Sequence, residues 1–178
     1  MSMTIEIPTI DDLQEISALY KETWLATYPN VEHGITVEDI EAWFSKEETE
    51  QWIKKRKENF AAHLADKTAY FKIARLDGKI VGVCGGENKA SGVHLKSIYV
   101  LPSYQGKGVG SALLKDFFDW VGEHQDLTVH VAVYNAQAIA FYESKGFVDT
   151  GQTFSEERFK MKSGNSIVET EMIRKRLK

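Results

Sequence analysis

The sequence predicts an α/β protein built on a mixed, twisted sheet of about six or seven strands with helices on both faces. Three observations predict this fold. Near residue 69 the hydrophobic period changes from helical to alternating. The order strand–helix–strand over 93–133 is typical of a parallel βαβ unit. Hairpin signals on both sides of that unit add antiparallel strands.

Composition and length favour one soluble domain over residues 1–178, with a net charge of −4. A mildly acidic chain is not expected to bind nucleic acid nonspecifically. The single cysteine, Cys84, cannot form an internal disulfide, and no apolar run reaches the length of a membrane span. The first residues do not resemble a signal peptide. We therefore expect a cytoplasmic protein with no membrane or nucleic-acid partner.

The N-terminal third is expected to be mainly helical. Asp11 or Asp12 is a candidate N-cap for a first helix, which should end at Pro29–Asn30. Thr36, followed by three acidic residues, predicts the start of a second helix. A third helix is predicted by the spacing of Trp52, Ile53, Phe60 and Leu64.

The rest of the chain alternates between predicted strands and helices. Asp77–Gly78 predicts a two-residue hairpin turn, and a second hairpin is expected around 163–165. A helix should run from about Gly108 to Glu123. A shorter helix should run from Ala136 to Gly146, with this glycine as its stop. The predicted strands, including one before the first helix, are 4–7, 69–76, 79–88, 93–100, 128–133, 147–159 and 166–174.

The segment with the strongest chemical signal is a loop in which Gly106, Gly108 and Gly110 alternate. It follows a predicted strand and opens a predicted helix, and a helix N-terminus offers unpaired N–H groups to anions such as phosphates. Glycines allow positive φ, so that successive N–H groups can converge on one ligand. The register fits neither a P-loop nor a dinucleotide-binding fingerprint. A turn without a ligand is the alternative.

The stretch Gln105–Gly110, QGKGVG, resembles the Q/R-x-x-G-x-G/A signature of the GNAT superfamily, the acetyl-CoA-dependent N-acetyltransferases. The segment Val133–Phe147, VYNAQAIAFYESKGF, is similar to the second conserved block of that family. The resemblance is clearest from about residue 69 to 150. It implies acetyl-CoA as cofactor and a V-shaped splay between the two central parallel strands.

The resemblance also implies roles for single residues. The pantetheine arm of the cofactor and the oxyanion are expected to meet the backbone of Ile98, Tyr99 and Val100. Asn135 would contact the cofactor as well as cap its helix, and Tyr142 would be the general acid. The loop backbone would hold the pyrophosphate, with the Lys107 side chain optional, through Gln105, Gly106, Lys107, Gly108, Val109, Gly110 and Ser111.

The general base and the acceptor site are less defined by the sequence. His94 or Glu87 is the candidate base, and a water path to bulk solvent is the alternative. The resemblance implies that the first two helices and their link cover the acceptor end of the site, where aromatic residues and an acid would suit an amine, although packing is the other interpretation of the aromatics. These candidate acceptor residues are Trp24, Tyr28 and Glu32. His130 is expected to pack in the sheet, and no spacing indicates a metal site.

The function implied is transfer of an acetyl group from acetyl-CoA to a primary amine. The acceptor would be a small molecule, polyamine-like, or a peptide, attacked directly in a ternary complex. A buried Cys84 makes an acetyl-cysteine route unfavourable. The alternative is a catalytically silent module that binds coenzyme A or a partner. The resemblance leaves a homodimer open.

Overall fold

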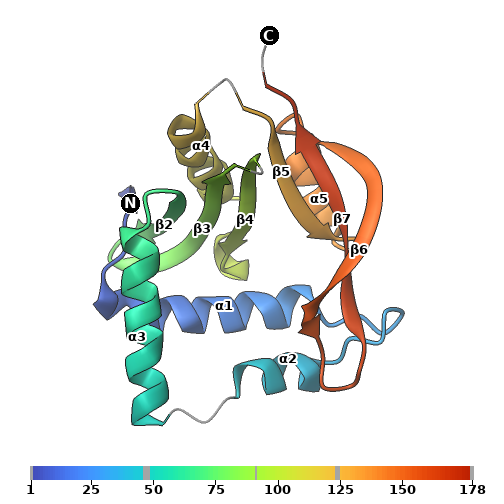
Figure 1. The fold of residues 1–178 in the computed structure, drawn as a ribbon, viewed down its shortest axis with the longest axis horizontal. Coiled ribbons are helices and arrows are strands. Elements are labelled where there is room, and N and C mark those ends of the chain that lie inside the picture. The colour runs from blue at the N-terminus through green and yellow to red at the C-terminus, as the bar shows by residue number, and fades with distance from the viewer. Residues whose placement is uncertain (1, 46–48, 91, 123–124, 177–178) are drawn as a thin grey trace.

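The computed structural model describes residues 2–45, 49–90, 92–122 and 125–176, apart from the side chain at position 158. Within them lies one seven-stranded mixed sheet of order β1-β2-β3-β4-β5-β7-β6 (Figure 1). The strands are β1 (Met3–Glu6), β2 (Ala69–Leu76), β3 (Lys79–Lys89), β4 (Gly92–Val100), β5 (Leu127–Ala132), β6 (Val148–Lys160) and β7 (Ser166–Arg174). The helices are α1 (Leu13–Thr27), α2 (Val37–Phe44), α3 (Glu50–Ala65), α4 (Val109–Val121) and α5 (Ala136–Glu143).

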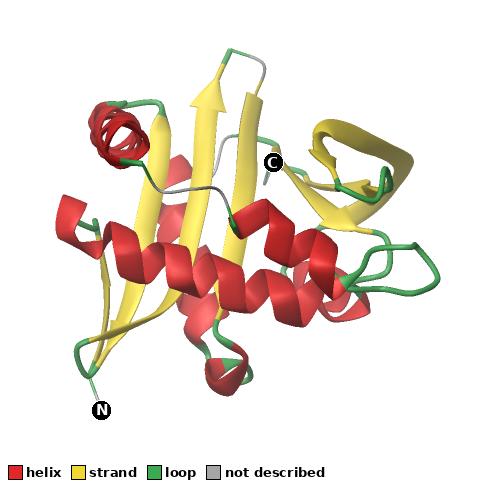
Figure 2. Cartoon of the chain, turned by 90° about the horizontal axis from the view of Figure 1, so that it is seen from below, coloured by secondary structure: helices red, strands yellow, loops and turns green. Residues whose placement is uncertain are grey.

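Helices cover both faces of the sheet, which confirms the predicted fold class (Figure 2). On one face, Ile16 and Leu19 of α1 pack in a buried cluster with Ile73 of β2. On the other, Leu113 and Phe117 of α4 belong to a larger buried cluster shared with β3, β4 and β5. None of the described helices has the length and apolar character needed to cross a membrane.

The two central parallel strands diverge, as the family resemblance implied. β4 and β5 pair only over 93–95 and 127–129, although β4 continues to Val100 (Figure 1). On its other side, β4 pairs with β3 with an irregularity between Gly85 and Gly86, where the register passes from Ser97 to Leu95. The extra residue in β4 increases the local twist and turns the strand away from β5. The opening between β4 and β5 holds the candidate site.

Most predicted turns and helix ends are confirmed. Asp77 and Gly78 both have positive φ, at 48° and 87°, as a tight hairpin turn requires. Gly146 closes the segment after α5 with φ 84°. The helix predicted to reach Glu123 ends at Val121, because Gly122 has φ 79° and breaks the helical path. Glu123 itself lies outside the described residues.

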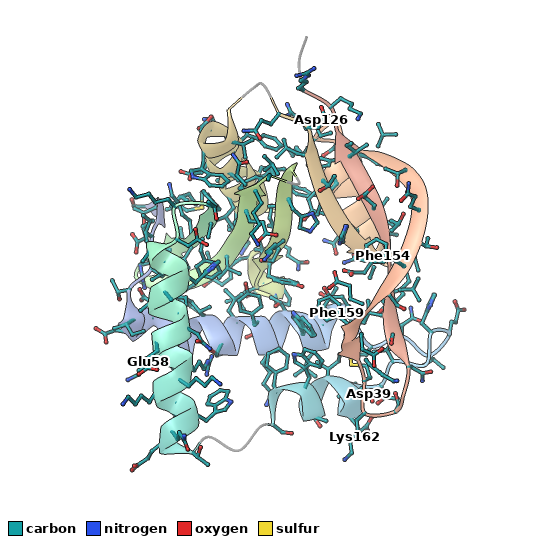
Figure 3. All side chains as sticks on the ribbon, in the orientation of Figure 1. Asp39, Glu58, Asp126, Phe154, Phe159 and Lys162 are labelled. Atoms are coloured by element: carbon teal, nitrogen blue, oxygen red, sulfur yellow. The ribbon has the colours of Figure 1, made fainter. Side chains whose placement is uncertain are left out.

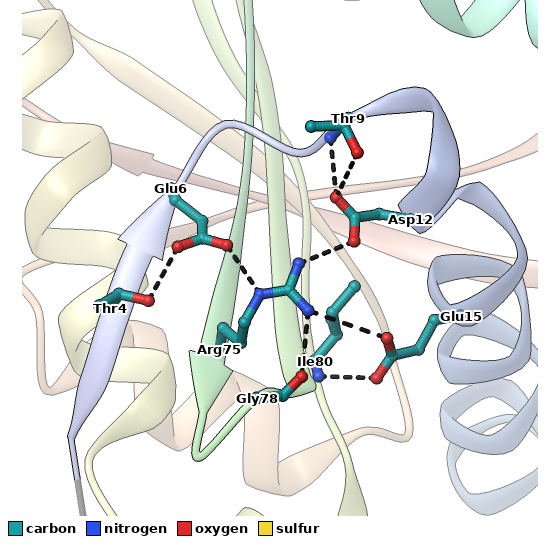
Figure 4. Close-up of polar contacts among 8 residues, drawn as sticks. All are labelled: Thr4, Glu6, Thr9, Asp12, Glu15, Arg75, Gly78 and Ile80. Carbon is teal, nitrogen blue, oxygen red and sulfur yellow. Dashed lines mark hydrogen bonds and ion pairs between the residues drawn. The ribbon is translucent and has the colours of Figure 1, made fainter.

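The start of α1 differs from the prediction that Asp11 or Asp12 caps it. Asp12 occupies the N-cap position, but its carboxylate makes no bond to the α1 amides. It accepts instead from the Thr9 N–H at 2.8 Å and from Arg75 at 2.7 Å (Figure 4). Arg75 also donates to Glu6 at 2.7 Å. The guanidinium offers several donors in one plane, so a single arginine ties β1, β2 and the start of α1 together.

The hairpin between β6 and β7 is fastened to the start of α2. Thr36 caps α2 as predicted, since its hydroxyl oxygen accepts from the Asp39 N–H at 3.1 Å. The buried Asp39 carboxylate accepts in turn from the Ser163 N–H and the Ser163 hydroxyl, both at 2.8 Å. Asn165 donates to the Gly34 carbonyl at 2.8 Å. These bonds fix one wall of the site described next.

Candidate active site

The divergence of β4 and β5 opens a cavity of about 410 Å³, within the usual size range of small-molecule sites. Its walls come from the end of β4, the glycine loop, α5 and the side of α1. Of the residues predicted to bind the cofactor, those that line it are Ile98, Tyr99, Val100, Gln105, Gly106, Gly108, Gly110, Ser111, Asn135 and Tyr142. Most of the predicted cofactor set is therefore brought together around one space.

The glycine loop lines this cavity with Gly106, Gly108, Gly110 and Ser111, but not with Lys107 and Val109. Gly106 and Gly108 have φ of 72° and 84°, and a Cβ at either would meet no atom within 4 Å. The N–H groups of residues 106–111 donate no hydrogen bond to the part of the chain that the structure describes. The next amide, that of Ala112, donates normally to the Gly108 carbonyl at 3.0 Å. Six consecutive donors at a helix N-terminus fit the negatively charged oxygens of a diphosphate.

Side chains around the loop hold its shape. The side-chain NH₂ group of Gln105 donates to the Val100 carbonyl at 3.1 Å, which joins the loop to the end of β4. Asn135 caps α5, because its Oδ1 accepts from the third N–H of that helix at 3.1 Å. The Lys107 ammonium lies 5.3 Å from the centre of the Tyr104 ring, and the side chain is exposed. The loop backbone therefore offers the anion-binding donors, and Lys107 adds an exposed positive charge beside them.

Tyr142 stands where this cavity meets a second one. The residue is 6% exposed, and its ring packs between those of Phe141 and Phe147. Among the described residues, its hydroxyl has no hydrogen-bond partner. Burial raises the pKa of Tyr142 well above its usual value. The hydroxyl therefore stays protonated at neutral pH and can donate a proton or hydrogen bond to a group in the cavity.

The second, narrower cavity of about 80 Å³ shares part of the β4 and α5 wall with the first. Trp24 and Tyr28, the predicted acceptor residues, both line it. Phe159 of β6 faces the same aromatic group, with its ring centre 5.9 Å from that of Trp24 (Figure 3). The Tyr28 and Tyr99 hydroxyls are 2.7 Å apart. Glu32 is exposed and lines neither cavity.

The two candidate bases lie in different surroundings. His94 lines the second cavity, with Nδ1 at 2.9 Å from the Thr128 hydroxyl and its ring centre 4.3 Å from that of His130. Burial, and next the proximity of His130, lowers the pKa of His94 to about 4. Glu87 lines neither cavity, and two lysines hold its carboxylate at 2.7 and 2.8 Å. Burial raises the pKa of Glu87, but these lysines keep it below its usual value.

Sequence reasoning missed a polar group in the second cavity. His130 of β5, Glu156 of β6 and Glu169 of β7 bring one nitrogen and two carboxylate oxygens within 4.8 Å of one another. His130 was expected to be a packing residue, and its ring does pack against Phe154, with centres 4.4 Å apart. One signal was available in the sequence. In the alternating pattern of β7, Glu169 follows Ile167 on the same side, where an apolar residue is expected.

A comparison with protein families decides the assignment. The model of the Acetyltransferase (GNAT) family matches residues 37–147, more than half of the chain. The chain belongs to the GNAT acetyltransferase family. GNAT acetyltransferases use acetyl-CoA, so the family and the cofactor expected from the sequence are confirmed. The match includes the glycine loop, Asn135 and Tyr142.

Individual GNAT relatives agree with this assignment. An uncharacterized N-acetyltransferase of Mycobacterium tuberculosis is 33% identical over 97 residues, which are 52% of this chain and 61% of the relative. The chain thus spans about three fifths of the curated relatives that it matches. The PaiA N-acetyltransferase of Thermoplasma acidophilum, solved with coenzyme A, has a TM-score of 0.73 at 21% identity, covering 98% of this chain and 99% of its own. A spermidine N-acetyltransferase chimera from Vibrio cholerae has a TM-score of 0.69 at 23% identity, covering 98% and 95%. At these identities the structures show a shared fold.

Proposed function

We propose that residues 1–178 form a single catalytic domain that acetylates a primary amine of a small molecule, polyamine-like, or of a peptide. The amine attacks the thioester directly while both substrates are bound. One observation carries the proposal: within the described residues the amides of 106–111 donate no hydrogen bond, four of these six residues line the larger cavity, and Tyr142 lines both cavities. One cavity suits the acetyl donor and the other the acceptor.

The larger cavity supplies the contacts that a coenzyme A thioester needs. The amides of 106–111 would bind the diphosphate, and the backbone of Ile98, Tyr99 and Val100 would bind the pantetheine arm as an added strand. Beyond Leu95, this edge of β4 pairs with no strand in the described part of the chain. When bound, acetyl-CoA supplies the thioester carbonyl. An N–H of the same β4 segment would stabilise negative charge on that carbonyl oxygen.

Tyr142 would act as the general acid. Because burial raises the pKa of its hydroxyl, the group is protonated at every pH at which the enzyme would work. This hydroxyl can donate a hydrogen bond to the departing thiolate and share its proton as negative charge develops on the sulfur. Cys84 is 0% exposed, and burial raises the pKa of its thiol, so it does not become a thiolate that could take the acetyl group. Direct transfer is the route consistent with both residues.

His94 would assist proton removal through water. Its pKa of about 4 leaves the imidazole neutral at pH 7, with Nδ1 held by Thr128. A neutral imidazole can accept a hydrogen bond from a water that carries the ammonium proton away. Glu87 is less suited to this role, because its carboxylate lines neither cavity and is already paired with two lysines.

Steady-state kinetics of Tyr142→Phe test the proposal. We expect kcat to fall about 100-fold, as for loss of a general acid, while the Kd for acetyl-CoA changes less than about two-fold. Initial velocities with both substrates varied should give intersecting lines. Tyr70→Phe is the matched control, because it removes a hydroxyl that bonds Asp116 away from both cavities. An unchanged kcat in Tyr142→Phe, or parallel lines for the wild type, would contradict the mechanism.

A further inference from the structure

The second cavity contains a group of three hydrogen-bond acceptors contributed by three strands. Glu169 of β7 is 8% exposed, and His130 and Glu156 are half-buried. All three residues line the cavity. One atom from each lies within 4.8 Å of the other two, and His130 Nδ1 is 3.7 Å from a Glu156 oxygen. We call these three residues the acceptor triad, because each offers an atom that can accept a hydrogen bond.

The spacing of the acceptor triad suits an ammonium ion. A primary ammonium has three N–H donors arranged tetrahedrally. Acceptors about 2.8 Å from its nitrogen are therefore at most about 4.6 Å apart, and the three triad atoms lie within 4.8 Å of one another. Ligands about 2.1 Å from a tetrahedral zinc ion would be about 3.4 Å apart. The 3.7 Å between His130 Nδ1 and a Glu156 oxygen lies between these two values, so binding of an ammonium has to be tested with metal ions removed.

Lys96 also lines the cavity, but most of its walls favour an alkyl chain and a positive charge. Trp24, Tyr28, Tyr99 and Phe159 line it, and aromatic faces attract cations. The charge of Glu169 reaches these walls: together with burial, which is the larger cause, it raises the pKa of Tyr28 and of Tyr99. A cation between these rings and the triad would therefore interact with both.

We propose that the acceptor triad selects substrates with a second ammonium group, so that the preferred acceptor is an unbranched diamine. This inference rests on the proposed function. One nitrogen would lie near Tyr142, where the cavities meet, and the far ammonium would bind Glu169, Glu156 and His130. A volume of about 80 Å³ is narrow enough to favour a linear chain over a peptide. An ω-amino acid would be rejected, because its carboxylate would face two carboxylates.

Calorimetry on the wild-type protein tests the inference without mutation. The ligands are 1,4-diaminobutane, butylamine and 4-aminobutanoate, titrated in the presence of coenzyme A and EDTA. Because a charge-assisted hydrogen bond to the far nitrogen is missing in butylamine, we expect the diamine to bind about 10- to 100-fold more tightly. The ω-amino acid should bind more weakly than butylamine. Equal affinity for diamine and monoamine would overturn the inference, and so would diamine binding that EDTA abolishes and zinc restores.

Variants then assign the preference to the acceptor triad. In Glu169→Gln, the ratio of diamine to butylamine affinity should fall about 10-fold or more, since a charge is lost while the shape is kept. Glu156 is half-buried, so Glu156→Gln is less disruptive to folding. It should lower the same ratio, and it keeps the test valid if Glu169→Gln fails to fold. Glu22→Gln, on the exposed side of α1, is the control and should keep the wild-type ratio. An unchanged ratio in a folded triad variant would overturn the inference.

Two outcomes separate this inference from the proposed function. A protein that binds the diamine selectively, yet neither binds nor consumes acetyl-CoA, would contradict the proposed function and support the inference. A protein that acetylates butylamine as well as the diamine, with equal affinities, would support the proposed function and overturn the inference.

Discussion

The buried carboxylate of Asp39 offers a quantitative test, because it holds the β6–β7 hairpin, a wall of the second cavity, against α2 (Figure 3). Asp39 is 4% exposed. One oxygen accepts from the Ser163 N–H, and the other accepts from the Ser163 hydroxyl and from the Thr36 N–H at 3.1 Å. In Asp39→Asn, an NH₂ group replaces one of the two carboxylate oxygens. This group cannot accept the hydrogen bonds that the replaced oxygen accepts. At about 1.5–3 kcal/mol per hydrogen bond to a charge, with partial repair by rotation of the serine hydroxyl, we expect a loss of about 2–4 kcal/mol.

The pH dependence of this loss has a definite sign. Burial alone would raise the pKa of Asp39, but the hydrogen bonds from Ser163 and Thr36 outweigh burial and keep it below its usual value. A carboxyl whose pKa is lower in the folded protein stabilises the fold above its unfolded pKa, which is about 3.9. This stabilisation is lost as the pH falls through the folded pKa. The difference between wild type and Asp39→Asn should therefore be complete at pH 7 and should shrink below about pH 4.

Urea unfolding followed by tryptophan fluorescence measures both quantities. The free energy of unfolding is extrapolated to water for wild type and Asp39→Asn at pH 7 and at about pH 3.5. Asp11→Asn, an exposed aspartate, is the matched control and should change stability by less than about 0.5 kcal/mol. A loss below about 0.5 kcal/mol for Asp39→Asn at pH 7, or an equal loss at both pH values, would refute the reasoning.

Two further predictions concern the site. Gly108→Ala should lower the free energy of unfolding by about 1–2 kcal/mol, because its φ of 84° is unfavourable for a residue with a Cβ. It should also raise the Kd for acetyl-CoA, whereas the control Gly78→Ala, at φ 87°, should lose similar stability but bind acetyl-CoA normally. The pKa of His94 near 4 predicts that this residue causes no inflection in log kcat/KM between pH 6 and 9. An inflection near pH 6.5 that His94→Gln removes would contradict the assignment of a neutral imidazole.

The sequence defined most of the fold because its local signals agree with its packing. β2 has the predicted bounds, since an alternating run ends at the Asp77–Gly78 turn. The short 3₁₀ turns at Ile10–Asp12 and Pro102–Tyr104 were not predicted, because three residues establish no period. The position of β7 between β5 and β6 was also not predicted. Alternation indicates which side of a strand is buried, but it does not indicate which strand lies beside it.

The candidate site was predictable where it depends on backbone and less so where it depends on contacts between distant segments. The glycine loop, Asn135 and Tyr142 belong to two short motifs, and the structure places them around one cavity. Glu156 and Glu169 lie on strands that carry no motif, and only the pairing of β5 with β7 and of β7 with β6 brings them to His130. Such a group becomes visible when the sheet order is known.

The measurement that tests the central claim most directly is calorimetric binding of acetyl-CoA in parallel with S-acetylpantetheine, which has the same thioester but lacks the diphosphate and the 3′-phosphoadenosine attached to it. If the amides of 106–111 hold the diphosphate, acetyl-CoA should bind in the micromolar range. S-acetylpantetheine should then bind at least about 30-fold more weakly, because it lacks the charge-assisted bonds. No detectable binding of acetyl-CoA at high micromolar concentration, or equal affinity for the two thioesters, would contradict the account.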